Sequence, residues 1–211
     1  VPILVIGAGA CGISAALTAK ENGAKVMLLE RDDTPSGSSA LSTCLIPAAG
    51  TKLQAAAGVE DSVEIFAEDL IAKAKNKSDP DMAYWVAAAS GPTVDWLVDT
   101  VGLPLSLVTG FKYPGHSVYR MHGSPNRTGS ELMAVMNEAI GREAIDVATS
   151  ATVTDLYADT ATGRVTGVRI TRPDGATEDI GCDALILACN GYGGNPDMVR
   201  EFVEEMAYAW Y

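Results

Sequence analysis

A glycine-rich run near the N-terminus has the residue spacing that binds dinucleotides. Residues 7–12 read GAGACG, so Gly7, Gly9 and Gly12 follow the GxGxxG pattern, and Glu30 lies 23 residues after Gly7. In this pattern the first glycine permits a tight turn, the second admits a pyrophosphate, and the third lets a helix pack on a strand. The N–H groups at the start of that helix face the phosphates, and a carboxylate accepts a hydrogen bond from a ribose hydroxyl.

The elements around this run favour a β-α-β dinucleotide site. Residues 3–6 form a continuous apolar run typical of a buried parallel strand, residues 12–22 have helical spacing, and residues 25–29 form a second apolar run ending at Glu30. With 21 glycines in the chain, the alternative is an ordinary turn without a ligand, but the strand-turn-helix context argues against it. The charge of Glu30 would repel a 2′-phosphate, which disfavours NADP.

The composition argues against several classes of partner. The 211 residues carry a net charge of −12, so we expect no binding to nucleic acid or to anionic membrane surfaces. No apolar segment approaches the roughly 18 residues of a membrane span. The four cysteines lack metal-binding spacing and there are two histidines, so we expect no metal site. We expect reduced, mostly buried thiols, which are typical of the cytoplasm. The first residues, VPILVIG, predict a strand rather than a signal peptide, in a natural chain that starts a few residues earlier.

Helical segments are expected in the middle of the chain. Capping boxes at residues 61–64 and 128–131 introduce helices over 65–75 and 129–142. Asp79-Pro80 starts a helix that runs towards residue 101, with an interruption at Gly91-Pro92 left open. Residues 103–124 read as a loop.

The last third has a different pattern. Three alternating, β-branched segments joined by tight turns predict an antiparallel β-meander over residues 151–158, 164–171 and 176–180. A buried strand is expected at residues 184–188, followed by CNGYGGNP. Asn195-Pro196 begins a last helix. Residues 208–211 read as an aromatic helix end packed on the core, or alternatively as an exposed apolar patch.

Three segments make the chain resemble a family of flavoproteins. They are VIGAGACGISAA with LLER, then GSSALSTCLIPAAGT, then VTDLYAD…GRVTGVRI…DALILACNGYGGNP. Together they resemble the family of fumarate reductases, succinate dehydrogenase flavoprotein subunits, 3-ketosteroid dehydrogenases and tricarballylate dehydrogenase-like proteins, over nearly the whole chain.

This resemblance implies an α/β fold with a Rossmann-like FAD-binding domain, of the glutathione-reductase type with an antiparallel β-meander. The capping domain and the final FAD-domain strand would be missing. We interpret residues 1–211 as one FAD-binding domain, incomplete at its end. Its parts are the βαβ unit with the flavin loop (1–58), a helical insertion (59–145), and the meander with the late strand and helix (146–211).

The resemblance also implies FAD as cofactor and assigns its contacts. The dinucleotide end would meet Gly7, Gly9, Ala10, Cys11, Gly12, Glu30 and Arg31. The small residues of the second segment would admit the ribityl chain and the isoalloxazine: Ser38, Ser39, Ser42, Thr43, Cys44, Ala49 and Gly50. The main chain at Val153 would meet the adenine, and the late strand would pass close to the cofactor at Ala188, Cys189, Asn190 and Gly191. Residues 36–51 hold no histidine for a covalent link, so noncovalent FAD is expected.

The sequence departs from the family in two places. Thr43-Cys44 stands where many relatives have Gly-Gly, and Cys189-Asn190-Gly191 stands where they often have Thr-Gly-Gly. Both changes add side-chain bulk beside the expected cofactor.

The catalytic residues are not assigned. In this family the substrate is clamped by a capping domain, and the proton-transfer groups lie beyond the segment resembled here, so a C-terminal capping domain or a second chain is needed to complete the site. Inside the chain, packing, surface or hydrogen-bonding roles are favoured for the remaining candidates, which are Cys11, Cys44, His116, His122 and Arg127.

Three functions remain in view. The leading hypothesis is an FAD-dependent oxidoreductase that transfers hydride to or from a CH–CH or C=C bond of a small carboxylate or ketone substrate. One alternative is an FAD-binding module or fragment without turnover, motivated by the missing capping domain. Another is an NAD-dependent dehydrogenase domain, which the fingerprint alone permits.

Overall fold

The computed structural model describes residues 1–208, and their contacts form two compact units. One unit joins Val1–Asp33 to the chain from Val147 onward, and the other spans Thr34–Asp146. The interpretation of the chain as one domain with three parts stays a prediction. The aromatic segment expected at residues 208–211 falls outside the described residues apart from Tyr208, which is 90% exposed and so does not pack on the core as expected.

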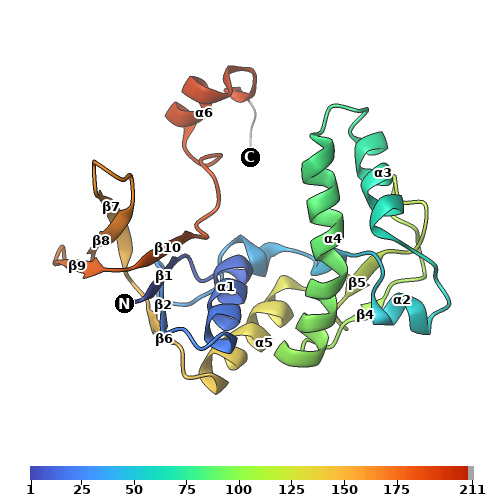
Figure 1. Cartoon of the computed structure of the whole chain (residues 1–211), viewed down its shortest axis with the longest axis horizontal. Coiled ribbons are helices and arrows are strands. Elements are labelled where there is room, and N and C mark those ends of the chain that lie inside the picture. The colour runs from blue at the N-terminus through green and yellow to red at the C-terminus, as the bar shows by residue number, and fades with distance from the viewer. Residues whose placement is uncertain (209–211) are drawn as a thin grey trace. The chain divides into compact units, whose positions relative to one another are not determined.

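The first unit is built on a parallel sheet with the strand order β10-β1-β2-β6 (Figure 1). Strand β1 (Ile3–Ile6) pairs in parallel with β2 (Val26–Leu29) and with β10 (Ala184–Leu187), and β6 (Asp146–Ala148) lies at the edge beyond β2. Helix α1 (Ala10–Glu21) connects β1 to β2. The predicted β-α-β unit is therefore confirmed.

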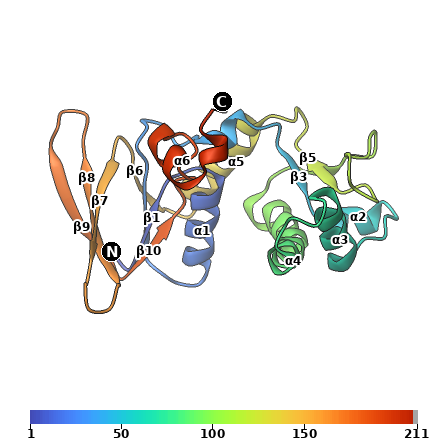
Figure 2. The same ribbon diagram turned by 90° about the horizontal axis from the view of Figure 1, so that it is seen from above.

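The meander and α1 cover opposite faces of this sheet (Figure 2). The meander strands are β7 (Thr152–Ala158), β8 (Val165–Thr171) and β9 (Thr177–Gly181), all antiparallel as predicted. Because side chains alternate along a strand, Leu4 and Ile6 point to the meander face and pack in one cluster with Val168 and Ile170. The fully buried Val5 lies between them in the sequence and points to the α1 face.

Strand β10 is less buried than its sequence predicts. It occupies the edge of the parallel sheet, and Leu187 is 60% exposed within the described part of the chain. A continuous apolar run identifies a strand of a parallel sheet but does not distinguish an edge position from a central one. Beyond it, Asn195 caps helix α6 (Pro196–Phe202), as predicted, and a 3₁₀ turn follows at η3 (Glu204–Met206).

The second unit contains helices and a small antiparallel sheet with the order β3-β5-β4. Its elements in chain order are η1 (Ser38–Leu41), β3 (Leu45–Pro47), α2 (Lys52–Ala56), α3 (Val63–Lys73), α4 (Pro80–Trp96), η2 (Leu97–Val101), β4 (Ser106–Leu107), β5 (Met121–Gly123) and α5 (Gly129–Arg142). Helices α3 and α4 lie side by side (Figure 1). The segment expected to be a loop, residues 103–124, thus contributes two short strands, which were too short to show an alternating pattern.

Helix α4 is not interrupted at Gly91-Pro92. It continues through Pro92 and ends in the π-helical turn η2. Pro92 brings no N–H, and the hydroxyl of Thr93 donates to the Ala89 carbonyl at 2.7 Å. Gly91 is required here for packing, because a Cβ at this position would lie 2.3 Å from the carbonyl oxygen of Ala49.

In the second unit, two of the three predicted helix starts agree with the sequence. Asp79 caps α4 and Thr128 caps α5, but the residue that caps α3 is Ser62, whose side chain accepts from the N–H of Ile65 at 3.2 Å. The expected cap, Asp61, bonds a distant arginine instead. Among the described helices, none is long and apolar enough to cross a bilayer.

Candidate cofactor site

The glycine turn of the first unit leaves no room for side chains at two positions. Gly7 has φ +98°, and a Cβ there would lie 2.6 Å from the carbonyl oxygen of Ala188. A Cβ on Gly12 would lie 1.8 Å from the carbonyl oxygen of Gly7. Real contacts of this kind do not occur below 3.0 Å, so the turn, the helix and the end of β10 can approach this closely only with glycine at both positions.

Helix α1 starts next to this turn without a capping side chain. Its N-cap is Gly9, which supplies no side-chain hydrogen bond, and the first turn contains no acidic residue. The first N–H groups of a helix have no intrahelical acceptor, and the helix dipole is positive at this end. The arrangement therefore suits an anion such as a pyrophosphate.

Glu30 connects the end of β2 to the glycine turn. Glu30 is 5% exposed. Its Oε2 accepts a hydrogen bond from the N–H of Ala8 at 2.8 Å, and its Oε1 accepts one from the N–H of Asp32 at 3.1 Å. A carboxylate oxygen has further lone pairs, so these bonds leave acceptor capacity for a ribose hydroxyl. Sequence reasoning assigned Glu30 to the ribose alone and missed its bond to the turn.

The end of β10 lies against the same turn. The N–H of Ala188 donates to the carbonyl of Ile6 at 2.8 Å, and Gly7 would contact both Ala188 and the Cα of Cys189 if it carried a Cβ. Asn190 then adopts φ +63°, a left-handed conformation that asparagine tolerates better than most residues. The structure thus brings the fingerprint and the late strand end together, and their contacts with the cofactor stay a prediction.

Two further predicted contacts of the first unit differ in their surroundings. Val153 lies in β7, where the pairing with β8 shifts register between Val153 and Asp155. Such a bulge disrupts the hydrogen-bonding ladder locally, which suits a main-chain contact with a ligand. Arg31 is exposed and lies 3.7 Å from the carboxylate of Asp32.

The second unit contains the small-residue loop predicted to meet the flavin. Residues Ser38 and Ser39 are in η1, which packs against the start of α5: a Cβ on Gly129 would lie 1.9 Å from the carbonyl oxygen of Ser39. The N–H of Gly129 also donates to the carbonyl of Ser42 at 2.7 Å. Thr43 is exposed, whereas Cys44 is 2% exposed.

Cys44 adopts a backbone conformation that favours glycine. Its φ is +47°, in the left-handed region, which is uncommon for a residue with a side chain. A glycine at this place would adopt it without strain. All four cysteines are free thiols, but Cys11 and Cys189 are exposed and Cys182 is half-buried, so the expectation that the thiols are mostly buried is wrong. Partial burial raises the pKa of Cys182.

The segment after Cys44 is held from two sides. On one side β3 pairs with β5, and the N–H of Ala48 donates to the carbonyl of Arg120 at 3.1 Å. On the other side the hydroxyl of Ser90 in α4 accepts from the N–H of Ala49 at 3.1 Å. The predicted flavin contacts Ala49 and Gly50 therefore lie in a segment with a defined main-chain path.

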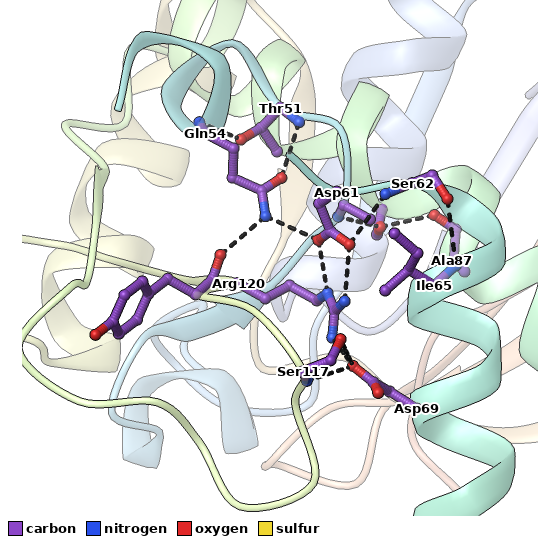
Figure 3. A network of polar contacts seen from close by, with 12 residues as sticks. Thr51, Gln54, Asp61, Ser62, Ile65, Asp69, Ala87, Ser117 and Arg120 are labelled. Atoms are coloured by element: carbon purple, nitrogen blue, oxygen red, sulfur yellow. Dashed lines mark hydrogen bonds and ion pairs between the residues drawn. The ribbon is translucent and has the colours of Figure 1, made fainter. Parts of the chain in front are cut away.

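A buried arginine supports this part of the unit (Figure 3). The guanidinium of Arg120 donates twice to Asp61, at 2.7 and 2.8 Å, and once to Asp69 at 2.7 Å. Its side chain and that of Asp61 are fully buried, and its Cζ lies 4.5 Å from the ring centroid of Phe66. Burial opposes the charge of Arg120, but the bonds and charges of Asp61 and Asp69 outweigh it and raise the pKa of the arginine.

Asp69 stays ionised at lower pH than an ordinary aspartate. Burial opposes the charge of Asp69, but hydrogen bonds from Ser117 and Arg120 lower its pKa below the usual 3.8. The N–H and hydroxyl of Ser117 donate to it at 2.7 and 2.9 Å. Its role is therefore to hold the arginine and the loop before β5.

The two histidines lie close to this network. His122 is fully buried in β5, with Nδ1 3.2 Å from the carbonyl oxygen of Ile46 and Nε2 2.9 Å from Oγ1 of Thr51. Burial lowers the pKa of His122, and carbonyl groups nearby oppose this in part. This confirms the hydrogen-bonding role favoured from the sequence. His116 is half-buried against the rings of Phe66 and Tyr113, and burial lowers its pKa.

The sequence-predicted contacts thus fall into two sets. The fingerprint, Glu30, Val153 and the end of β10 belong to the first unit, and the residues from Ser38 to Gly50 belong to the second. The supporting residues Ser90 and Arg120 were not singled out from the sequence. The one available signal for Arg120 was its place two positions before a histidine in an otherwise loop-like segment. Within residues 1–208 no group of three or more His, Cys, Asp or Glu side chains is placed to hold a metal ion.

The comparison with known proteins identifies the class of this chain. A family model described as an FAD binding domain matches residues 2–211, and the chain belongs to this family. It is an FAD-binding domain of the flavoprotein oxidoreductase type, as predicted.

Several particular proteins are similar to it. The urocanate reductase of Eggerthella lenta is 33% identical over 98% of this chain and 34% of its own length. A probable fumarate reductase of Shewanella frigidimarina is 31% identical over 95% of this chain and 34% of its own. The open conformation of a flavocytochrome c3 fumarate reductase superimposes with a TM-score of 0.88 at 30% identity, over 98% of this chain and 36% of that one. The chain thus spans about a third of the length of these relatives.

The first unit fits FAD on its own observed geometry. Gly7 and Gly12 form a cradle whose closest approaches are to main-chain atoms, and the start of α1, which has no capping side chain, lies next to the same turn. Glu30 provides a buried carboxylate at the end of the next strand. These are the features that a dinucleotide pyrophosphate and its ribose require.

Proposed function

We propose that this chain is the FAD-binding part of a flavin-dependent reductase or dehydrogenase acting on a CH–CH or C=C bond of a small carboxylate or ketone. The observation that carries the proposal is the glycine cradle held by the Glu30 carboxylate. The substrate class rests on the relatives, two of which are named for the reduction of urocanate and fumarate.

The residues of the chain bind and orient the cofactor in this proposal. The start of α1 meets the pyrophosphate, Glu30 the ribose, and the bulge at Val153 the adenine. Within the first unit, the end of β10 lies close to the cofactor in this proposal. Within the second unit, the segment from Ser38 to Gly50 provides the proposed flavin contacts. Bound FAD supplies the hydride-carrying chemistry. Because residues 36–51 contain no histidine, we propose noncovalent binding, and because the chain spans a third of its relatives, the catalytic residues are sought in the rest of the protein.

An absorbance spectrum of the purified full-length protein tests the cofactor. We expect a flavin spectrum and the release of FAD by acid, identified by its mass. A nicotinamide dinucleotide in place of FAD, or a colourless protein that FAD does not reconstitute, would contradict the proposal. Covalently retained flavin after acid treatment would contradict noncovalent binding alone.

A turnover assay tests the reaction. The full-length protein, supplied with a reduced dye, is expected to reduce a small unsaturated carboxylate such as fumarate or urocanate with saturation kinetics. Flavin binding without turnover on carboxylates or enones would favour the FAD-binding module instead.

We also propose a cytoplasmic location, supported by the four unpaired cysteines, which are typical of a reducing compartment. Fractionation of the source cells with compartment markers tests this, and recovery of the protein outside the cytoplasmic fraction would contradict it.

The net charge of −12 further supports a small-molecule substrate over nucleic acid.

A further inference from the structure

His122 contacts both ends of the segment that contains two of the proposed flavin contacts. Its Nδ1 lies 3.2 Å from the carbonyl oxygen of Ile46, and its Nε2 lies 2.9 Å from Oγ1 of Thr51. These two partners lie just outside Pro47 and Gly50, on either side of the segment 47–50. The ring is fully buried, so water does not compete for either bond.

The partners determine which ring nitrogen carries the proton. A carbonyl oxygen only accepts, so Nδ1 of His122 donates to Ile46. A neutral imidazole then has its lone pair on Nε2, and the hydroxyl of Thr51 donates to it. The Thr51 oxygen in turn accepts from the N–H of Gln54 at 3.0 Å, so every polar atom in this chain of bonds has a defined partner.

His122 is itself held in a rigid position. It pairs with Ile46 in the register of β5 on β3, and Arg120, two residues earlier, is fixed by three bonds to Asp61 and Asp69. On the far side, Gln54 donates to Asp61 at 2.8 Å and to the carbonyl of Tyr119 at 2.9 Å (Figure 3). A buried hydrogen-bond network therefore runs from the ion pair to both ends of the segment 47–50.

We propose that His122 is a positioning residue for the flavin: by bonding Ile46 and Thr51 it fixes the main-chain path of Ala49 and Gly50 on which the bound cofactor rests. This inference rests on the proposed function. A residue that only filled the core would need no hydrogen-bonding atoms. The two ring nitrogens of His122 instead contact Ile46 and Thr51, at the two ends of one segment. His122 acts through that segment and is not assigned to the chemistry.

Three substitutions in the full-length protein separate the two bonds. His122→Asn keeps a donor near the Nδ1 position, His122→Gln keeps an acceptor near the Nε2 position, and His122→Phe keeps a ring without either. We expect the Kd for FAD to rise about fivefold for Asn and for Gln and at least about tenfold for Phe, as loss of one or two net hydrogen bonds predicts. The visible circular dichroism of the bound flavin should change in the same order.

A matched control separates positioning from stability. Ser62→Ala removes the cap of α3 and lowers the melting temperature without touching the segment, so its Kd for FAD and its flavin spectrum should equal those of the wild type. The inference is overturned if the His122 variants melt at lower temperature but bind FAD within twofold of the wild type with an unchanged spectrum.

A second pair keeps the test decisive if the His122 variants do not fold. Thr51→Val removes the hydroxyl bonded to Nε2, and Thr51→Ser retains it. We expect the valine variant to bind FAD about fivefold more weakly and the serine variant to match the wild type; equal binding by both overturns the inference. If the variants bind FAD normally and the wild-type protein binds FAD and turns over, only this inference fails and the proposed function stands. If the wild-type protein does not bind FAD, the inference and the proposed function both fail.

Discussion

The carboxylate of Glu30 accepts a hydrogen bond from the backbone N–H of Ala8 at 2.8 Å, inside the fold and across 22 residues of sequence. The end of β2 thereby holds the turn that precedes α1. The same carboxylate is the proposed partner of the FAD ribose. One side chain thus links the stability of the cofactor-free turn to the affinity for the cofactor.

Substitution of Glu30 should affect stability and affinity together. Glu30→Gln keeps one acceptor for Ala8 but turns an amide N–H₂ towards the N–H of Asp32, so we expect a loss of about 1–2 kcal/mol in the free energy of unfolding. The Kd for FAD should rise about tenfold, since the ribose loses a charged acceptor. Urea denaturation measures the free energy of unfolding, and titration with FAD measures the Kd. The exposed Glu68→Gln serves as control, and an unchanged urea midpoint for Glu30→Gln would contradict the link.

A single methyl group should disrupt the glycine cradle. In Gly12→Ala the new Cβ would lie 1.8 Å from the carbonyl oxygen of Gly7, so main chain must move, and we expect FAD binding to weaken by at least about a hundredfold (~3 kcal/mol). Gly141→Ala is the matched control. It lies in α5 with nothing within 4 Å of its Cβ, so it should stabilise the helix by about 0.5–1 kcal/mol. Titration with FAD distinguishes the two, and normal affinity in Gly12→Ala would show that the turn is more adaptable than the structure indicates.

Removal of the buried Arg120 guanidinium should strongly reduce the stability of the fold. Arg120→Met would leave the fully buried carboxylate of Asp61 without its cation, and breaking a buried pair in this way costs about 3–5 kcal/mol. The same change at Arg169, whose bond to Asp179 lies at the surface, should cost less than about 1 kcal/mol. Chemical denaturation of both variants checks the contrast; similar losses would mean that Arg120 contributes through packing alone.

The pH dependence of stability should report on Asp69. Its pKa in the folded protein lies below the usual 3.8, so the unfolded chain takes up a proton first as the pH falls, and the stabilisation is lost in that window. Above the usual pKa the contribution is complete. We therefore expect the difference in unfolding free energy between wild type and Asp69→Asn to be greatest near pH 5 and to shrink as the pH falls below about 3.8 towards the lower folded pKa. A difference that stays constant from pH 5 to 2.5 would contradict this assignment.

The local patterns of the sequence were sufficient for most elements. The apolar runs and the glycine spacing located β1, α1 and β2, and the alternating segments located the meander, because these patterns arise from contacts within one element and its neighbour. The short strands β4 and β5 were missed because two or three residues carry no period. The cap of α3 was placed at Asp61 instead of Ser62, because a local pattern cannot reveal that Asp61 bonds Arg120, 59 residues away.

For the candidate site, the sequence by itself determined the dinucleotide fingerprint and the acid that follows it, Glu30, because the residue type at each of these positions follows from a local steric or electrostatic requirement. Only the tertiary structure showed that Glu30 holds Ala8, that Gly91 admits the carbonyl of Ala49, and that His122 spans the segment from Ile46 to Thr51. These relationships join residues 22 to 76 positions apart. Nothing in a residue's own type or its near neighbours specifies such a partner, because the partner is chosen by how the elements pack.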